Sequence, residues 1–515
     1  MPLASTVLSL VLLGLISQSS QDKLRRYYEA AEAQRSAGNL TAAENEFESI
    51  LAEGYQRLAK ICSARKGYRE AVNAAEAAAT YRPESEEVLL DLGIAYFEAQ
   101  EFKKALEPLH RILARNAESA GAHHMAGKTY FMLRDAAKAA TELEIALKLA
   151  PDNSDIAYTL GLAYLREREL APAQRVYGRM LNQLGDKPQI HILFGRAYRE
   201  AGFLVEAIEE FKKVLAFDPN YPRAHYYLGL TYLLNDGASR RGEAKEEFKA
   251  ELVAHPNEFF AHYYLGVVYI YDRDWKLAIA SLERASQIQP DSPDPYFHLG
   301  QAYQGLDQHD LAVEALRRTI ALNPRLEHNE YQVTTAHYRL GQSLLKIGQT
   351  EAGKSELRLA SKLKAEAFKR VKDFYSVAGD TGETKTELVP KTAAEDIIAK
   401  SSSPEEAVKF ASESGEAFYQ KVVASAHNNI GMLRAQQQDF QGAVAQFSLA
   451  AKWNPQQEGL NYNLGLAYFK LEMFEEAVAP LERELKAHPG NSPARQLLEL
   501  SNRMLKEKAG RRTNR

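Results

Sequence analysis

The sequence has few of the features that support disulfide, nucleic-acid or membrane-spanning roles. Cys62 is the only cysteine in 515 residues, so no intramolecular disulfide can form, and we expect a small buried thiol. The net charge of -4 is small for this length, which argues against bulk electrostatic attraction to nucleic acid. The apolar run from Val7 to Ile16 is too short to cross a bilayer. We therefore expect no nucleic-acid partner and no membrane span beyond a possible N-terminal anchor.

That apolar run is the only targeting signal in the chain. It fits the core of a signal peptide, and Ser17 and Ser19 offer small residues for cleavage, although no Lys or Arg precedes the run. We expect residues 1–20 to be a signal peptide or an uncleaved apolar segment. The protein is then exported, either periplasmic or secreted, and a cytoplasmic protein is the alternative.

One short signature recurs along the chain at a fixed period. Its clearest form is a Leu-Gly pair with Tyr three residues after the Gly, as in Leu160, Gly161 and Tyr164. The glycines lie 34 residues apart at positions 93, 127, 161, 195 and 229 and recur at 266, 300, 341, 431 and 465, and Ala31 and Ala59 fill the slot in two weaker copies. A small residue follows most anchors by twelve positions, with Ala244 in that slot after a three-residue insertion, and a large apolar residue usually comes four positions later. Such a period predicts a stacked array of helix pairs.

The pattern resembles the tetratricopeptide repeat family over roughly residues 24 to 490, apart from an insert near 370–415. The resemblance implies an all-α fold, a right-handed superhelical solenoid of about twelve antiparallel helix pairs. Physical packing agrees with it, because small residues let two helices approach closely and large residues fill the seam between them. The recurrent Tyr is expected to pack between helices with its hydroxyl at a wet edge.

The loss and return of the period divide the chain into segments. After residues 1–20 we expect a main array of about ten repeats over 21–370 and a flexible insert with a re-entry helix over 371–415. Two further repeats follow over 416–490. A capping helix over 491–508 covers the exposed end, and a basic tail over 509–515 completes the chain.

The resemblance also indicates where a partner would bind. In the family, the first helix of each pair lines the concave face, and the residues three before and one after the anchor point into it. Carried over position by position, the candidate partner-binding residues are Tyr158, Arg196, Tyr226, Tyr263, Phe297, Tyr338 and Tyr462. Aromatic side chains there would suit an extended peptide or a helix, although packing against neighbouring repeats is the competing interpretation.

No motif for catalysis, a cofactor or a metal stands out. Six histidines lie four residues before an anchor, namely His123, His191, His225, His262, His337 and His427. Residues one repeat apart sit about 10 Å from each other, so they form a ladder and not a metal cage. There is no Gly-x-Ser-x-Gly elbow, no His-Glu-x-x-His and no paired-Cys motif. We expect neither catalytic nor metal-binding residues and no cofactor.

Two classes of function remain. The first is a non-catalytic scaffold that holds a peptide or partner protein in the groove of the solenoid. The second is the substrate-recognition arm of an enzyme complex, for example one associated with a glycosyltransferase, whose catalytic subunit is a separate chain. Self-association through the faces of the array is a further possibility.

Overall fold

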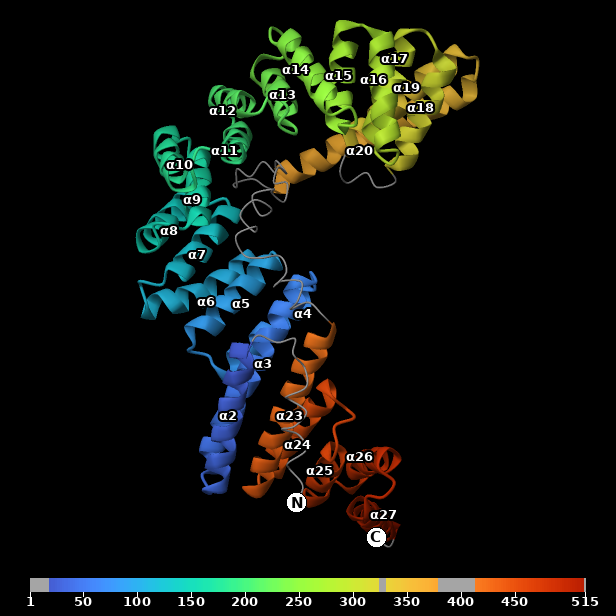
Figure 1. The fold of residues 1–515 in the computed structure, drawn as a ribbon. Coiled ribbons are helices and arrows are strands. Elements are labelled where there is room, and N and C mark those ends of the chain that lie inside the picture. Colours follow the sequence, from blue (N-terminus) through green and yellow to red (C-terminus); the bar gives the residue numbers. More distant parts are fainter. Residues whose placement is uncertain (1–17, 324–329, 378–412, 514–515) are drawn as a thin grey trace. The chain divides into compact units, whose positions relative to one another are not determined.

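A computed structural model describes residues 18–323, 330–377 and 413–513, and all regular secondary structure in these ranges is α-helical (Figure 1). Residues 1–17 of the predicted signal segment 1–20 lie outside these ranges, and residues 18–20 begin the first described helix, so export stays a prediction. Among the described residues, none of the helices is both long and apolar enough to cross a membrane. The prediction of an all-α helical-repeat solenoid is confirmed.

The chain divides into two compact units. Unit 1 combines the residues up to Glu167 with those from Ile398 onward, and unit 2 runs from Arg168 to Ile397. The helices of unit 1 are α2 (Gln18–Ser36), α3 (Leu40–Ala64), α4 (Tyr68–Tyr81), α5 (Glu86–Glu98), α6 (Phe102–Arg115), α7 (Ala120–Met132), α8 (Ala136–Leu149), α9 (Ser154–Arg166), α23 (Glu413–Gln436), α24 (Phe440–Trp453), α25 (Leu460–Lys470), α26 (Phe474–Ala487) and α27 (Ser492–Thr513).

Unit 2 contains a further series of helices. Its helices are α10 (Leu170–Leu184), α11 (Pro188–Glu200), α12 (Leu204–Phe217), α13 (Ala224–Asp236), α14 (Arg241–Ala254), α15 (Phe259–Asp272), α16 (Trp275–Ile288), α17 (Pro293–Gly305), α18 (His309–Leu322), α19 (Glu330–Lys346) and α20 (Thr350–Val377). The helix α20 continues past the limit at residue 370 that the sequence suggests, and α27 likewise continues past residue 508. The rest of the expected insert, residues 378–412, lies outside the described part.

The anchoring glycines lie where two helices of a pair come closest. A Cβ atom on Gly195 would lie 2.6 Å from Cε1 of Phe211, the large residue sixteen positions later. Gly266 stands in the same relation to Leu282, whose Cγ atom would lie 2.6 Å from such a Cβ. The predicted seam of small residues and large apolar residues is therefore confirmed, because any side chain at these anchors would overlap its partner.

In several repeats the recurrent Tyr links its helix pair to the preceding pair. The Tyr164 hydroxyl donates to Oε1 of Glu144 at 2.6 Å, and the Tyr303 hydroxyl donates to Oε1 of Glu283 at 2.8 Å. In both cases the carboxylate belongs to the second helix of the preceding pair. The Tyr ring thus packs between helices, and its hydroxyl reaches a polar, partly exposed edge, as the sequence predicts.

The two weak N-terminal copies share one long helix. Ala43 and Phe47 on α3 occupy the small and large slots of the first copy, and Ala59 on the same helix is the anchor of the next copy. The anchors Ala31 and Ala59 are closer together than the regular 34-residue period, because no turn separates the two copies. Cys62 is buried on this helix, as expected, and burial raises the pKa of its thiol.

The C-terminal repeats pack directly on α3. In Figure 1, α23 runs beside α3, and the two helices are in extensive contact. Phe418, Val423 and Ile430 on α23 belong to the same buried cluster as Leu51 and Leu58 on α3. Ion pairs border this contact, with Arg434 Nη2 2.8 Å from Glu44 Oε1. The N-terminal repeats and the first of the two C-terminal repeats therefore share one hydrophobic core.

Candidate partner-binding surface

The structure distributes the seven predicted binding residues over both units. Tyr158 on α9 and Tyr462 on α25 belong to unit 1, where Tyr158 is buried and Tyr462 packs partly buried against the last helices. The other five lie on consecutive first helices of unit 2, namely α11, α13, α15, α17 and α19. Arg196, Tyr226, Tyr263, Phe297 and Tyr338 thus form a series along unit 2, and that series is the candidate surface.

Tyr226 lies beneath this surface. Its side chain is 8% exposed, and its ring stacks on Phe260 with a centroid distance of 5.5 Å. Tyr264 and Phe248 enclose it further, at centroid distances of 6.0 and 6.5 Å. Burial raises the pKa of the Tyr226 hydroxyl, which stays neutral at ordinary pH. Tyr226 therefore packs beneath Phe260 and Tyr264 and offers little surface area to a partner.

Four aromatic side chains of unit 2 reach the surface at neighbouring first helices. Phe260 is 36% exposed, Tyr338 is 50% exposed, and Tyr263 and Phe297 are half-buried. We call Phe260, Tyr263, Phe297 and Tyr338 the aromatic track. The sequence analysis missed Phe260, although it lies three residues before Tyr263 and thus on the same face of α15.

Neighbouring rings hold the track in place. Tyr263 stacks almost parallel to Phe259 at a centroid distance of 6.2 Å and contacts His298 at 5.6 Å. Phe297 meets His298 edge-on at 5.1 Å. Tyr338 accepts a hydrogen bond from Nε2 of Gln342 at 2.9 Å. Rings fixed in this way lose little side-chain entropy when a partner covers them.

Two arginines lie at the α11 end of the series. The guanidinium carbon of Arg196 is 5.8 Å from the centroid of the Tyr227 ring, and that of Arg199 is 5.1 Å from the same centroid. The Tyr227 ring in turn stacks on Phe211 at 5.5 Å. Arg199 was not among the predicted residues, although it lies three positions after Arg196, on the neighbouring turn of the helix.

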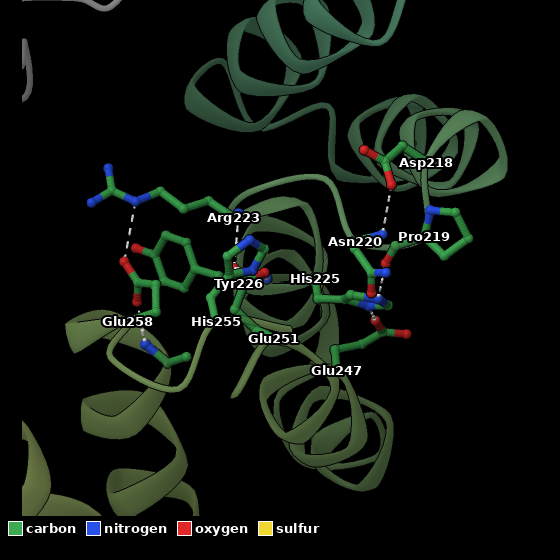
Figure 2. Close-up of polar contacts among 11 residues, drawn as sticks. Asp218, Pro219, Asn220, Arg223, His225, Tyr226, Glu247, Glu251, His255 and Glu258 are labelled. Carbon is green, nitrogen blue, oxygen red and sulfur yellow. Dashed lines mark hydrogen bonds and ion pairs between the residues drawn. The ribbon is translucent and has the colours of Figure 1, made fainter. Parts of the chain in front are cut away.

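A charged corner lies at the start of α13 (Figure 2), and the guanidinium carbon of its Arg223 lies 5.8 Å from the centroid of the Phe260 ring of the track. The buried Glu251 carboxylate accepts hydrogen bonds from the backbone N–H groups of Arg223, at 2.9 Å, and Tyr226, at 3.2 Å. Arg223 Nε donates to Glu258 Oε1 at 3.1 Å, and His255 Nδ1 lies 3.0 Å from Glu251 Oε1. Both carboxylates are therefore occupied by structural contacts, since Glu251 caps α13 and Glu258 also accepts from the N–H of Ala261.

A depression opens next to this corner. Its volume is about 530 Å³, and Arg223, His255, Asn257, Phe259 and Gln289 are among the residues that line it. It lies between the end of α14, the start of α15 and the end of α16. Because Phe259 also stacks on Tyr263, the depression adjoins the aromatic track.

The repeated histidines make hydrogen bonds within their own helix pair or to the turn before it, and His427 also contacts Tyr55 on α3. His225 Nδ1 lies 2.5 Å from Glu247 Oε2 and Nε2 lies 3.0 Å from the carbonyl oxygen of Pro219, as Figure 2 shows. Both oxygens are acceptors, so both ring nitrogens donate, and the hydrogen bond to Glu247 is the main cause of the raised pKa of His225. Among the described residues, no group of three or more His, Cys, Asp or Glu side chains could hold a metal ion.

Family models match repeats in both units. The models described as TPR repeat or tetratricopeptide repeat match residues 64–128, 124–186, 195–236, 274–307, 293–326 and 428–492. The chain belongs to the tetratricopeptide repeat family. Repeats of this family typically act as non-catalytic scaffolds for protein interactions.

Solved structures resemble parts of this tetratricopeptide repeat chain. A MamA structure from Desulfovibrio magneticus RS-1 is 25% identical, covers 35% of this chain and 97% of its own, and has a TM-score of 0.32. YrrB, described as a TPR protein with an unusual peptide-binding site, is 22% identical, covers 37% of this chain and 96% of its own, and has a TM-score of 0.29. No curated protein matches the chain.

Proposed function

We propose that this tetratricopeptide repeat protein is a non-catalytic scaffold that holds a segment of a partner protein along the aromatic track of unit 2. A protein-interaction scaffold is the role that the family supports in general. The observation that carries the finer proposal is the exposure of Phe260, Tyr263, Phe297 and Tyr338 on three successive first helices.

Two physical reasons favour these rings as the contact area. Aromatic side chains contribute a large buried area for few rotatable bonds, and they dominate the energetics of many interfaces. Tyr263 and Phe297 are also braced by Phe259 and His298, so the surface is formed before a partner arrives. A preformed surface lowers the entropic cost of binding.

The test compares a track variant with a matched control in the full-length protein. The track variant carries Tyr263→Ala and Tyr338→Ala. The control carries Leu277→Ala and Leu311→Ala, which remove exposed apolar side chains from the second helices α16 and α18. Partners captured from extracts of the native host are identified by mass spectrometry, purified and titrated calorimetrically against each variant.

We expect the track variant to bind at least about tenfold more weakly than the unmodified protein, because truncation of central aromatic residues usually costs more than 1 kcal/mol each. The control variant should bind normally, and both should keep their helical circular dichroism. Equal binding by the two variants would reject the track as the contact surface, and a search that yields only a second copy of the chain would indicate self-association instead.

A further inference from the structure

His225 connects three structural elements of unit 2 (Figure 2). Its Nδ1 faces Glu247 on α14 at 2.5 Å, and its Nε2 faces the carbonyl oxygen of Pro219, in the turn before α13, at 3.0 Å. A neutral imidazole has one N–H group and can donate to only one of these oxygens, whereas an imidazolium donates to both. The hydrogen bond to Glu247 and the nearby Glu251 carboxylate, also on α14, raise the pKa of the ring. The contacts of His225 therefore depend on one additional proton.

His191 repeats this arrangement one repeat earlier. Its Nδ1 lies 2.5 Å from Oε2 of Glu210 on α12, and its Nε2 lies 2.5 Å from Oδ1 of Asp186, in the turn before α11. Lys213 pairs with the same Glu210 at 2.9 Å. The hydrogen bond to Glu210 is the main cause of the raised pKa of His191, and Asp186 adds to it. Each of the two histidines thus joins a first helix, its second helix and the preceding turn through a proton.

Two other repeats carry a different residue where this carboxylate would be. Ser281 occupies the corresponding position opposite His262 on α15, and Gln446 occupies it opposite His427 on α23. His262 Nε2 lies 3.0 Å from the carbonyl oxygen of Pro256, and burial lowers the pKa of its ring. Burial also lowers the pKa of His427 to about 4, despite the hydrogen bond to Gln446. Among these four histidines, the additional proton is held only where a carboxylate faces the ring.

The raised pKa of His191 and His225 fixes the direction of the effect on stability. An unfolded histidine titrates near about 6.5. A group whose pKa is higher in the folded state contributes its full stabilisation below the unfolded value and loses it as the pH rises through the folded value. Without the proton, each ring keeps one donor for two acceptors and loses a charge-assisted hydrogen bond.

We propose that His191 and His225 form a pH-sensitive link that holds the helices α11 to α14 together below about pH 6.5 and loosens as the pH rises above that value, so that these two repeats open locally. Tyr226 follows His225 on α13 and packs beneath Phe260, so the opening reaches the support of the aromatic track. The link acts on the helices themselves, whatever partner the track binds.

Hydrogen exchange of the full-length protein at about pH 6 and about pH 8.5 tests this proposal. Exchange rates of backbone amides are divided by those of unstructured peptides at the same pH, which removes the pH dependence of the chemical step. The variants are Glu247→Gln, which places in α14 the residue that faces His427 in its own repeat, and the control Glu246→Gln at an exposed glutamate of the same helix. In parallel, carbon-13 NMR follows the titration of labelled histidines, and the signal of His225 is assigned by its absence in His225→Gln.

We expect the protection of α13 and α14 to fall by about tenfold between the two pH values in the unmodified protein and in Glu246→Gln. Protection of α15 and α16, where Ser281 faces His262, should change by less than about twofold over the same range. In Glu247→Gln, the α13 and α14 amides should be less protected near pH 6 and should lose their pH dependence, while α11 and α12 keep theirs through His191. The His225 signal should titrate above about pH 6.5 in the unmodified protein and below it in Glu247→Gln.

Two results would overturn the proposal, and both come from the unmodified protein, so they do not depend on the folding of a variant with a changed α14. A His225 signal that titrates below about pH 6.5 would show that the ring does not hold the additional proton. Titration above that value, with equal protection of α13 and α14 at both pH values, would show that the proton is bound but does not hold the helices together.

Discussion

The hydroxyl oxygen of Tyr55 lies 3.0 Å from Nε2 of His427, although 372 positions separate the two residues in the chain. Trp453 Nε1 donates to the same oxygen at 3.0 Å, and His427 Nδ1 lies 2.6 Å from Gln446 Oε1. An indole N–H can only donate, so the Tyr55 oxygen accepts the hydrogen bond from Trp453. Nδ1 of the neutral His427 ring donates to the carbonyl oxygen of Gln446, so Nε2 has no hydrogen and accepts that of the Tyr55 hydroxyl.

This chain of hydrogen bonds links α3 to the C-terminal pair α23 and α24. It fixes His427 in one neutral tautomer inside a buried cluster that spans both ends of the sequence. A buried network in which every member is satisfied favours one arrangement over alternatives, since a shifted contact would leave polar groups unpaired. The network therefore gives the contact between α3 and the first C-terminal repeat a specificity that apolar packing alone would not provide.

The first prediction concerns Tyr55. Tyr55→Phe removes the oxygen that serves both Trp453 and His427, so the buried imidazole and the partly buried indole N–H lose their partner. The free energy of unfolding should therefore fall by about 1–3 kcal/mol. The free energy of unfolding is measured by urea unfolding with tryptophan fluorescence as the signal, in a Trp275→Phe background where Trp453 is the only tryptophan.

Tyr81→Phe is the matched control for this prediction. The Tyr81 ring stacks on Tyr55 at a centroid distance of 6.2 Å, but in the described part of the chain its hydroxyl makes no hydrogen bond. Its removal should change the free energy of unfolding by no more than about 0.5 kcal/mol. Equal losses in the two variants would show that the hydrogen bonds of Tyr55 make no specific contribution to the stability of this contact.

The local architecture could be predicted from the sequence because each contact is short in range and repeated. The relation between Gly195 and Phe211, for example, recurs at the same spacing in most copies. The contact between α3 and α23 could not be predicted in this way. The period determines how neighbouring repeats stack. All repeats share the same pattern, so the pattern does not show which distant repeats are in contact or through which faces.

The candidate surface was only partly predictable for a similar reason. Tyr226 and Tyr338 occupy the same position in their repeats, yet one is 8% and the other 50% exposed. The difference comes from the neighbours, because Phe260 and Tyr264 cover Tyr226. The position of an aromatic residue within its repeat does not determine whether it is buried or exposed, because the side chains that cover it belong to another repeat.

The second prediction is a pH dependence centred on His427. Burial lowers its pKa to about 4 despite the opposing hydrogen bond to Gln446, whereas an unfolded histidine titrates near about 6.5. Unfolding therefore takes up a proton between these two values. The free energy of unfolding should fall as the pH drops from about 6.5 to about 4, by a total on the order of 3 kcal/mol, and should lose this dependence below that range.

Comparison with His427→Gln isolates this contribution. The variant should be less stable near pH 7 and should show a smaller decline in urea midpoint when the pH falls to about 5, because the titrating group is gone. The Trp453 signal again reports the transition of unit 1. An identical pH slope in the two proteins would mean that His427 does not become protonated on unfolding.

The third prediction separates two glycines of unit 2 by the sign of their effect. A Cβ at Gly195 would lie 2.6 Å from the buried Phe211 ring, so Gly195→Ala should reduce the free energy of unfolding by about 1–3 kcal/mol. Gly178 on α10 has no atom within 4 Å of such a Cβ. Gly178→Ala should therefore increase the free energy of unfolding by about 0.5–1 kcal/mol, since alanine has a higher helix propensity than glycine. Urea unfolding with Trp275 as the only indole, in a Trp453→Phe background, gives both values. Changes of the same sign would mean that the anchoring glycines do not control the spacing of the helix pairs.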